Sequence, residues 1–554
     1  MTRLGRLLIA GLLSCARPPD ATLGPGAAPS PAAKATPSPT VTVRVLAFND
    51  FHGHLKPPDG RVPGVAGPVG GAAYVAAHLK RLGAEQPNTV VVAAGDLVGG
   101  SPLTSALFHD EPTILAMNAM KLSILGLGNH ELDEGLSEVL RLRRGGCHPK
   151  DGCALHPTFD GARFDFVAAN VEDEATGRRV LPAYVLRTFE GIPVAFVGMP
   201  LEGTPRVAAP GGVKGLLFRD EVRTVRALIP ELTKQGVAAI VVLLHEGGLV
   251  KGGGLNDCRD LHGPVVAIAE KADPAVDVFI TGHTHALYNC RVGGRPVTSA
   301  LSFGRVITEV NLVLDRRTKD VVEATAHNHA VTHDLAPDPV VGAIVDHASR
   351  LAAPKEDRVV GHIAGTLRAS ASGTGEATLG TVVADAHLEA TRKAGAQLAL
   401  TNVGGLRTDL TFARSRGEPV DGLVTYGEAF AAQPFGNVLV TLAVSGGELI
   451  DVLEDELRRG TIPQSSSNVR IRIAGRRLRE LLVDGSPVHA SDRVSVTVNS
   501  FMAETVPAFR RSKERVVGAE DLEALEAYFR AHPVVAVPVT KRVEREPAVD
   551  AGDE

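Results

Sequence analysis

The sequence predicts an α/β fold in which buried strands alternate with helices along the chain. Short runs of β-branched and aliphatic residues have the length of strands and stop at turn-forming groups. Longer mixed segments with helical character lie between several of these runs. A hydrophobic fraction of 44% and 59 glycines suit a large core with many turns, and the absence of Trp leaves Val, Leu, Ile and Ala to build it.

The first half of the chain carries most of the expected strands. They are 44–48, 89–94, 123–127, 164–169, 193–198, 239–244 and 276–280. Helices are expected at 71–83, 219–235 and 263–272. After Leu335 the pattern changes: a helix is expected at 338–351, and a second unit follows with apolar runs at 397–401, 438–444 and 494–498. The chain of 554 residues is therefore expected to fold as two domains, at 41–335 and 359–538, joined by a linker helix at 336–358.

Both ends of the chain are expected to lie outside these domains. Arg3 and Arg6 precede an apolar run at 7–13 that is too short to span a bilayer and fits a secretory signal peptide, 1–15. The run ends in Leu-Leu-Ser-Cys, which resembles a bacterial lipobox acylated at Cys15; an ordinary signal peptide is the alternative. A Pro/Ala-rich tether, 16–40, and a charged disordered tail, 539–554, complete the division. The protein is thus expected to be exported to the periplasm or cell surface, with a lipid anchor as its only membrane attachment.

Cysteine usage agrees with export. If Cys15 is lipidated, four cysteines remain, and an even number is typical of disulfides outside the cytoplasm. Cys147 and Cys153 flank a short loop and are expected to pair, which leaves Cys258 to pair with Cys290. A structural zinc site is the competing interpretation, but the chain has no Cys-x-x-Cys pair.

The charge balance limits the class of ligand. Lys and Arg total 58 against 63 for Asp and Glu, a net charge of −5. Proteins that coat nucleic acid need a concentrated positive field, so this balance argues against a nucleic-acid partner. It permits a small anionic substrate that a few local cations or metal ions hold.

Polar residues suited to metals follow the apolar runs of the first domain. The strand ends deliver seven such donors: Asp50, His52, Asp96, Asn129, His245, His283 and His285. Ligands of open α/β sheets bind beyond the carboxyl ends of the strands, so these side chains are expected in one crevice. Mixed oxygen and imidazole donors suit Mn²⁺, Zn²⁺, Co²⁺ or Fe²⁺. Seven donors are more than one tetrahedral ion can bind. Their number suits two divalent ions that share a bridging carboxylate, for which Asp96 is the candidate.

The order of these motifs resembles a known family. Asn-Asp-x-His, Gly-Asp, Gly-Asn-His-Glu-x-Asp, His and Gly-His-x-His occur as in the calcineurin-like metallophosphoesterases, and more narrowly in the family of 5′-nucleotidases, UDP-sugar hydrolases and 2′,3′-cyclic-nucleotide phosphodiesterases. The resemblance covers roughly residues 41–515. It implies a four-layer αββα sandwich followed by a separate α/β substrate-recognition domain.

The resemblance also assigns roles to residues. It places Asp50, His52, Asp96 and His285 around one ion, and Asp96, Asn129, His245 and His283 around the other. It implies that His130 contacts the phosphoryl group and that Asp133 orients the His130 ring. Two such ions bind a phosphate between them and activate water for in-line attack. His54 matches no ligand of the family and is expected to be a loop residue.

The second domain supplies candidate substrate contacts. In the family, positions matching Asn402 and Arg407 bind the nucleoside, and one matching Phe435 stacks on the base. Phe509 keeps register as a second stacking ring, although the Gly-Gly-Asp that supports it in the family is missing here. An Arg often found before the Glu-x-x-Leu-Gly motif is replaced near Gly373. These departures concern base and sugar selectivity, not hydrolysis.

The leading hypothesis is an exported 5′-nucleotidase-like phosphohydrolase. A phosphodiesterase or UDP-sugar hydrolase, or a phosphatase for a non-nucleotide ester, is the alternative within the enzymes. A non-catalytic surface lipoprotein that only binds its ligand is the alternative of another class, and the retention of both His130 and Asp133 argues against it.

Overall fold

The computed structural model describes residues 38–372, 375–414, 419–539 and 541–546. The expected signal peptide 1–15 with Cys15, almost all of the tether 16–40, Gly373 and residues 547–554 of the expected tail lie outside this part of the chain. Within the described residues, no helix is both long enough and apolar enough to cross a membrane.

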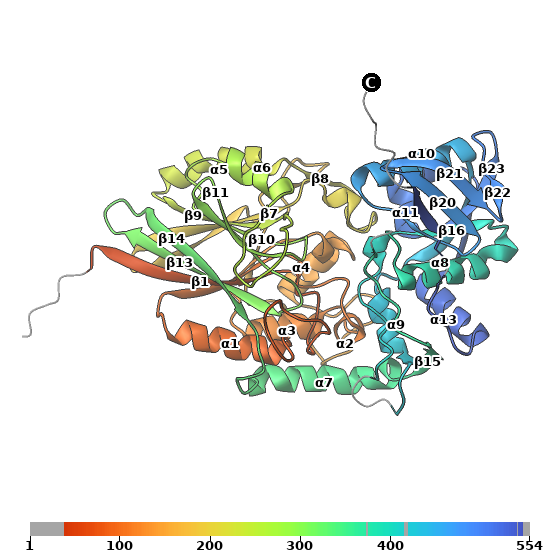
Figure 1. Cartoon of the computed structure of the whole chain (residues 1–554). Coiled ribbons are helices and arrows are strands. Elements are labelled where there is room, and N and C mark those ends of the chain that lie inside the picture. The colour runs from red at the N-terminus through yellow and green to blue at the C-terminus, as the bar shows by residue number, and fades with distance from the viewer. Residues whose placement is uncertain (1–37, 373–374, 415–418, 540, 547–554) are drawn as a thin grey trace, which may run out of the picture. The chain divides into compact units, whose positions relative to one another are not determined.

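Two six-stranded sheets form the centre of the first domain (Figure 1). The first has the order β14 (Val321–Ala330), β13 (Val306–Asp315), β1 (Thr40–Phe48), β2 (Thr89–Ala94), β3 (Ile124–Gly126) and β4 (Asp165–Val167). The second has the order β11 (Leu287–Val292), β12 (Arg295–Ala300), β10 (Val278–Thr281), β9 (Ala239–His245), β7 (Ile192–Pro200) and β6 (Tyr184–Phe189). The strands β1 to β4 run parallel, as do β7, β9 and β10, so each group has its carboxyl ends at one edge.

Alternation of side chains along the strands builds three apolar layers. On β1, Val43 and Val45 face the core between the two sheets, whereas Leu46 and Phe48 join the core outside the first sheet. On β9, Val241 belongs to the core between the sheets, and its neighbours Ile240 and Val242 belong to the core outside the second sheet. A strand buried on both faces reads as a continuous apolar run, which is why these strands are visible in the sequence.

Helices cover the outer face of each sheet. The core outside the first sheet includes residues of α1 (Ala72–Ala84), α3 (Glu111–Ala119), α4 (Leu136–Arg144) and α7 (Pro339–Glu356). The core outside the second sheet includes residues of α5 (Glu221–Lys234) and α6 (Pro264–Lys271). A short helix α2 (Leu103–Ala106) and a two-stranded sheet of β5 (Val171–Asp173) and β8 (Leu216–Phe218) complete the domain. The order helix, sheet, sheet, helix confirms the four-layer α/β sandwich.

The linker is the helix α7, which packs along α1 and α3 (Figure 1). Its first turn is capped by Asp338, whose carboxylate accepts the N–H groups of Val340 and Val341, and Pro339 occupies the first helical position. The helix ends at Glu356, three residues before the second domain begins.

The second domain is a separate α/β unit. Its five-stranded sheet has the order β19 (Gln464–Ser465), β16 (Leu398–Thr401), β23 (Arg493–Asn499), β18 (Val438–Ser445) and β24 (Arg515–Glu520). A four-stranded sheet has the order β22 (Ser486–Pro487), β21 (Arg477–Val483), β20 (Val469–Ala474) and β25 (Val543–Glu546), and β15 (Val359–His362) pairs with β17 (Leu423–Thr425). The helices are α8 (Thr378–Thr391), α9 (Tyr426–Ala432), α10 (Gly446–Arg459), α11 (Ser500–Thr505), α12 (Pro507–Arg511) and α13 (Asp521–Ala531).

Part of the expected disordered tail belongs to this fold. Residues Val543–Glu546 form β25, which pairs in parallel with β20. Arg542 is buried, and its guanidinium donates to the Asp385 carboxylate at 2.7 Å. Glu544 accepts from Arg472 at 2.9 Å. Charged residues that the sequence suggested were solvent-exposed and disordered are thus paired with neighbouring side chains. The prediction of disorder is wrong for residues 542–546.

The disulfides follow the expected pairing. Cys147 is joined to Cys153 and Cys258 to Cys290, with Cα atoms 4.6 Å and 5.1 Å apart. The first bond closes a small loop after α4. The second ties the segment that follows β9 to β11.

His387 of α8 is expected to lower the stability of the second domain at acidic pH. Its side chain is fully buried, and neither ring nitrogen has a hydrogen-bond partner among the described residues. Burial lowers the pKa of His387 to about 3. In the unfolded chain, His387 titrates near pH 6.5. Below that pH the unfolded chain therefore binds a proton at this residue, whereas the folded chain does not. The free energy of unfolding consequently falls as the pH falls.

We therefore expect His387→Leu to raise the free energy of unfolding by about 1–2 kcal/mol at pH 7.5. The gain should grow by about 1.4 kcal/mol for each pH unit below 6.5, measured as urea midpoints of the second domain. The exposed His489, changed to Leu, is the matched control. A gain that is equal at pH 7.5 and pH 5.5 would contradict the buried neutral state of His387.

Candidate functional site

The carboxyl ends of five strands meet at one edge of the sandwich and bring the predicted donors together. Asp50 and His52 follow β1, Asp96 follows β2, Asn129 follows β3, His245 ends β9, and His283 and His285 follow β10. These seven side chains, expected from the sequence to share a crevice, form two adjoining groups of potential metal ligands.

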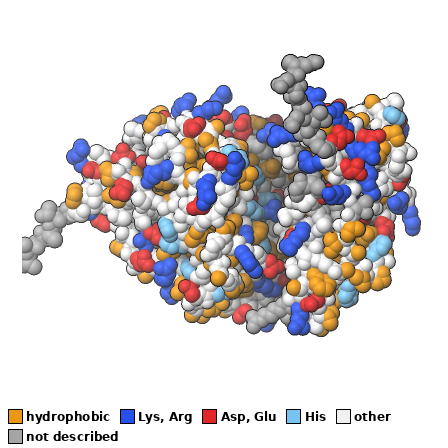
Figure 2. Space-filling view, in the orientation of Figure 1, with side chains coloured by type: hydrophobic (Ala, Val, Ile, Leu, Met, Phe, Trp, Pro, Cys, Tyr) orange, Lys and Arg blue, Asp and Glu red, His pale blue; other side chains and the backbone are white. Residues whose placement is uncertain are grey.

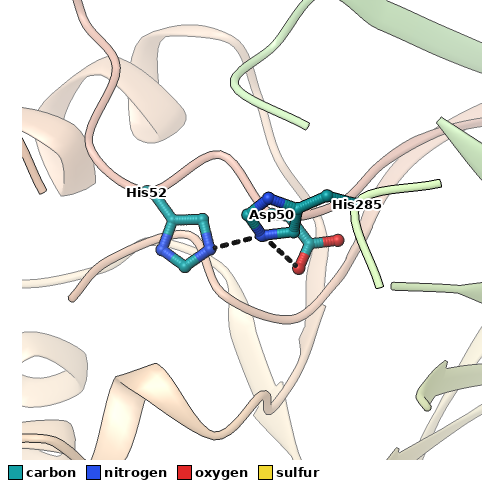
Figure 3. Close-up of side chains that lie close together, drawn as sticks. All are labelled: Asp50, His52 and His285. Carbon is teal, nitrogen blue, oxygen red and sulfur yellow. Dashed lines mark hydrogen bonds and ion pairs between the residues drawn. The ribbon is translucent and has the colours of Figure 1, made fainter. Parts of the chain in front are cut away.

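The first group consists of Asp50, His52 and His285 (Figure 3). The Nε2 atoms of His52 and His285 face each other at 3.1 Å, and Nε2 of His285 lies 3.5 Å from Oδ1 of Asp50. One nitrogen or oxygen atom of each side chain lies within 4.8 Å of the others. The side chains come from two strands that are far apart in the sequence.

The second group consists of Asp96, His245 and His283, with Asn129 beside them. Nε2 of His245 lies 3.0 Å from Oδ2 of Asp96 and 3.2 Å from Oδ1 of Asn129. The same amide oxygen lies 3.1 Å from Nδ1 of His283.

Asp96 connects the two groups. Its Oδ2 atom lies 3.6 Å from Nε2 of His52 in the first group and 3.0 Å from Nε2 of His245 in the second. Its other oxygen accepts the backbone N–H of His130 at 2.9 Å. A carboxylate that faces donors of both groups has the placement that a bridging ligand requires.

The backbone at this edge is held in an uncommon conformation. Five of the seven donors have positive φ angles: 48° at Asp50, 46° at His52, 53° at Asp96, 72° at His283 and 51° at His285. Such angles are rare for residues other than Gly and persist where the surrounding structure imposes them, commonly at functional sites.

Two glycines make room for the donors. A Cβ atom on Gly95 would lie 2.2 Å from Nδ1 of His245, and one on Gly128 would lie 2.2 Å from Oδ1 of Asp96. Gly95 also has φ +84°, which other residues seldom adopt. The Gly-Asp and Gly-Asn-His motifs therefore need their glycines so that the ligand side chains can approach.

The ring orientations fit cation binding. Nδ1 of His52 donates to the Gly99 carbonyl at 2.7 Å, and Nδ1 of His245 donates to the Ala94 carbonyl at 2.8 Å. Each bond turns the Nε2 lone pair toward the carboxylates, an arrangement typical of metal-binding histidines. Burial lowers the pKa of His52 and His285 well below the ordinary value, and that of His283 to about 4. Neutral imidazole is the form that binds metal, so the donor set fits divalent ions.

His245 and Asp96 differ from the other donors. Burial lowers the pKa of His245, but the Asp96 carboxylate, together with Asp50 and the Ala94 carbonyl, raises it to about 10. Burial raises the pKa of Asp96, yet the neighbouring His245 holds it well below its usual range. Asp96 is therefore held as a carboxylate at the centre of the site.

Glu131 is a supporting residue that the sequence interpretation missed. Its buried carboxylate accepts the backbone N–H groups of Asp96, Leu97 and Gly128 at 3.0, 2.6 and 2.7 Å. Burial raises its pKa to about 7 despite these bonds. Glu131 ties the turn after β2 to the turn after β3, and its place inside the Gly-Asn-His-Glu motif was the available signal.

His130 stands beside the two groups with Asp133. Nδ1 of His130 lies 2.7 Å from Oδ2 of Asp133, three residues along the 3₁₀ turn that begins at His130. Burial lowers the pKa of His130, but the carboxylates of Asp133 and Asp96 together raise it above the ordinary value. The pair thus has the geometry of an oriented imidazole whose other nitrogen is available to a ligand.

A cavity of about 680 Å³ adjoins the metal-ligand groups. Its wall includes Asp96, Asn129 and His130 from the first domain and Asn402, Arg407 and Phe435 from the second. Histidine side chains and blue side chains of Lys or Arg appear in the hollow near the middle of the face shown in Figure 2, and Arg407 is one of the arginines of the cavity wall.

Arg407 and Phe435 project toward the ligand groups. The guanidinium of Arg407 lies 3.2 Å from Nε2 of His52 and 5.7 Å from the ring centre of Phe435. The Phe435 ring in turn stacks near the His130 ring, with centroids 5.5 Å apart. Asn402 lines the same wall, where its amide oxygen accepts from Asn499 at 2.9 Å.

Phe509 is not in the cavity, and its expected role as a second stacking ring is wrong. Its side chain is fully buried in the apolar core of the second domain. Pro507 starts the separate helix α12, which turns Phe509 inward. Phe501, on α11, lines the cavity instead, together with Asn437 and Glu504. His54 stacks on Phe303 with centroids 3.9 Å apart and belongs to neither group of metal ligands.

Comparisons with known proteins agree with this architecture. The calcineurin-like phosphoesterase family matches residues 43–287, and the 5′-nucleotidase C-terminal domain matches residues 359–511. The endonuclease YhcR of Bacillus subtilis (strain 168) is 33% identical over 510 residues, 89% of this chain and 40% of the relative. The cell wall protein Lmo0130 of Listeria monocytogenes is 29% identical over 554 residues, 91% of this chain and 69% of that protein. The chain thus spans less than half the length of YhcR.

A solved structure shares the fold over nearly the whole chain. The 5′-nucleotidase precursor from Thermus thermophilus superposes with a TM-score of 0.77 at 24% identity, covering 92% of this chain and 100% of that one. Both family matches fall on the domain that the fold assigns to them and occur in the same order. The chain belongs to the calcineurin-like metallophosphoesterases that carry a 5′-nucleotidase C-terminal domain, a family of metal-dependent phosphoric ester hydrolases.

Proposed function

We propose that this protein is an exported dinuclear-metal phosphohydrolase that releases phosphate from nucleotides. The observation that carries the proposal is the position of Asp96, whose carboxylate faces His52 of one ligand group and His245 of the other. One ion would be held by Asp50, His52, Asp96 and His285, and the other by Asp96, Asn129, His245 and His283. The donor set accepts Mn²⁺, Zn²⁺, Co²⁺ or Fe²⁺.

The residues around the ions would position the ester. When bound, a pair of divalent ions polarises a phosphate and makes water nucleophilic at neutral pH. His130, oriented by Asp133, would donate from Nε2 to a phosphoryl or leaving oxygen as negative charge develops there. Arg407 would contribute a fixed positive charge beside His52, which favours an anionic substrate in the cavity.

The second domain would hold the nucleoside. The Phe435 ring offers a flat apolar face at the cavity wall, and Asn402 offers an amide for a sugar or base.

We also propose that the protein is exported, and the two disulfides support this location because such bonds persist in oxidising compartments. Acylation of Cys15 would attach it to a bacterial membrane, and incorporation of radiolabelled palmitate that a Cys15→Ser variant loses would test that point.

Phe435→Ala separates nucleoside recognition from chemistry. A stacked base contributes about 1–3 kcal/mol, so we expect KM for AMP to rise roughly 5- to 100-fold while kcat stays within a few-fold. Ribose 5-phosphate, which has no base, is the control substrate, and its KM should not change. An equal rise of KM for both substrates would contradict a stacking role.

A panel of phosphate esters with added Mn²⁺ tests the proposed function. It contains AMP, UDP-glucose, 2′,3′-cyclic AMP, a short single-stranded DNA and p-nitrophenyl phosphate, with products identified by chromatography. We expect AMP to be hydrolysed most efficiently. Cleavage of only the diesters or of DNA would assign a phosphodiesterase, and cleavage of only p-nitrophenyl phosphate a general phosphatase. Binding of nucleotides without turnover of any ester would leave a surface binding protein.

A further inference from the structure

A further cluster of potential metal ligands adjoins the rim of the cavity, where Glu134 lies. It contains His109, in the turn between α2 and α3, with His148 and Asp151 of the disulfide-closed loop. Glu134, which also lines the cavity, lies on its other side. None of these residues belongs to the two ligand groups that follow the strand ends.

The two rings are stacked so that they share a carboxylate. The centroids of His109 and His148 are 3.6 Å apart and the ring planes differ by 15°. Nε2 of His109 and Nδ1 of His148 both face Oδ2 of Asp151, at 2.9 Å and 3.3 Å. One ligand atom from each of these three side chains lies within 4.8 Å of the others.

The opposite edge of His109 is held by Glu134. Nδ1 of His109 lies 3.0 Å from Oε2 of Glu134. A metal-binding histidine commonly donates its other ring N–H to a carboxylate, which fixes the tautomer and strengthens the ligand. With Nδ1–H bonded to Glu134, the Nε2 lone pair of His109 is directed at Asp151 and His148.

The loop between Cys147 and Cys153 holds His148 and Asp151 close together. The Cys147–Cys153 disulfide closes it, and the backbones of His148 and Gly152 exchange two hydrogen bonds, at 3.1 Å and 2.9 Å. The N–H of Asp151 approaches Nδ1 of His148 at 3.3 Å, a weak contact that an ion would replace. The backbone of His109 is held at φ +49°, which is uncommon for His.

The carboxylates of Glu134 and Asp151 make this edge attractive to positive charge. Two imidazolium rings stacked at this distance would repel each other, whereas one divalent ion satisfies both rings and the carboxylate. Two nitrogens and one oxygen with an open fourth position match the ligand set of Zn²⁺.

We propose that His109, His148 and Asp151 form a third divalent-metal site of the zinc type, with Glu134 as the outer partner of His109. The bound ion joins the disulfide loop to the cavity rim, where Glu134 directly follows Asp133. The site thus links the loop to the segment that orients His130.

The test counts bound zinc on the full chain. Protein stripped of metal is equilibrated with Zn²⁺ alone, passed through a desalting column, and analysed by inductively coupled plasma mass spectrometry. We expect three zinc ions per wild-type chain and two in both His148→Asn and Asp151→Asn. The exposed His156, changed to Asn, is the matched control and should keep three.

The site at the strand ends is tested separately in the same experiment. Asp96→Asn should lose zinc from that site while the rim site keeps its ion, and a further loss in Asp96→Asn/His148→Asn shows that the two sites are independent. A zinc count that neither His148→Asn nor Asp151→Asn lowers would overturn the proposal whatever the protein hydrolyses. A wild-type count below three that still falls by one in both variants would instead count against the ion pair at the strand ends.

Discussion

Asp96→Asn is expected to lower AMP turnover by roughly a thousandfold or more and to reduce the metal bound at the strand ends. The substitution keeps the shape of the side chain and its acceptor for the His130 N–H, but it removes the charge that faces both ligand groups. Two ions each contribute several kcal/mol to transition-state stabilisation, and every 1.4 kcal/mol is about a factor of ten in rate. Steady-state kinetics and metal analysis of the same sample measure both effects.

The exposed Asp59, changed to Asn, is the control for loss of a charge in the same domain. Circular dichroism should show that both variants are folded. If Asp96→Asn retained its full metal content and turned over AMP within tenfold of the wild-type rate, Asp96 would not be a bridging ligand.

His130→Ala is expected to lower kcat by roughly a hundredfold or more while the metal content is unchanged. A donor aimed at developing negative charge is typically worth about 10²–10³ in rate. Asp133→Asn should have a smaller effect, roughly tenfold, because the ring remains but its orienting carboxylate is lost.

Metal retention is what distinguishes this role from that of a ligand. The exposed His156, which stacks on His347 outside the cavity, serves as the control when changed to Ala. A loss of bound metal in His130→Ala would assign His130 to the metal site, and an unchanged kcat would remove it from the mechanism.

The candidate metal ligands were accessible to sequence reasoning because two signals coincide at them. The strands of the first domain are buried on both faces and therefore read as unbroken apolar runs, as at β2 and β9. A polar residue that directly follows such a run sits at a strand end, and parallel strands share that edge. The positions of Asp96 and His245 follow from these two facts alone.

Contacts that depend on the tertiary fold were not accessible. The Gly-Asn-His-Glu motif singles out Glu131, but the backbone N–H groups that it binds belong to two separate turns, which only the fold brings together. Phe501 and Phe509 lie eight residues apart with equal apolar character, and only the break between α11 and α12 at Pro507 decides which one enters the cavity.

A high content of charged residues did not predict disorder correctly. Residues 543–546 are rich in charge and were expected to be disordered, but Glu544 finds a partner in Arg472 of the neighbouring strand. The sequence does not reveal the rim cluster, because His109 and His148 are separated by α3 and α4 and no family motif connects them.

Anomalous diffraction from crystals soaked in Mn²⁺ tests the central claim most directly, because it locates the ions rather than counting them. We expect two peaks about 3.5–4 Å apart, one beside His52 and His285 and the other beside His245 and His283, with Asp96 in contact with both. A single peak at the strand ends, or two peaks of which Asp96 touches only one, would contradict the shared aspartate on which the proposed chemistry rests.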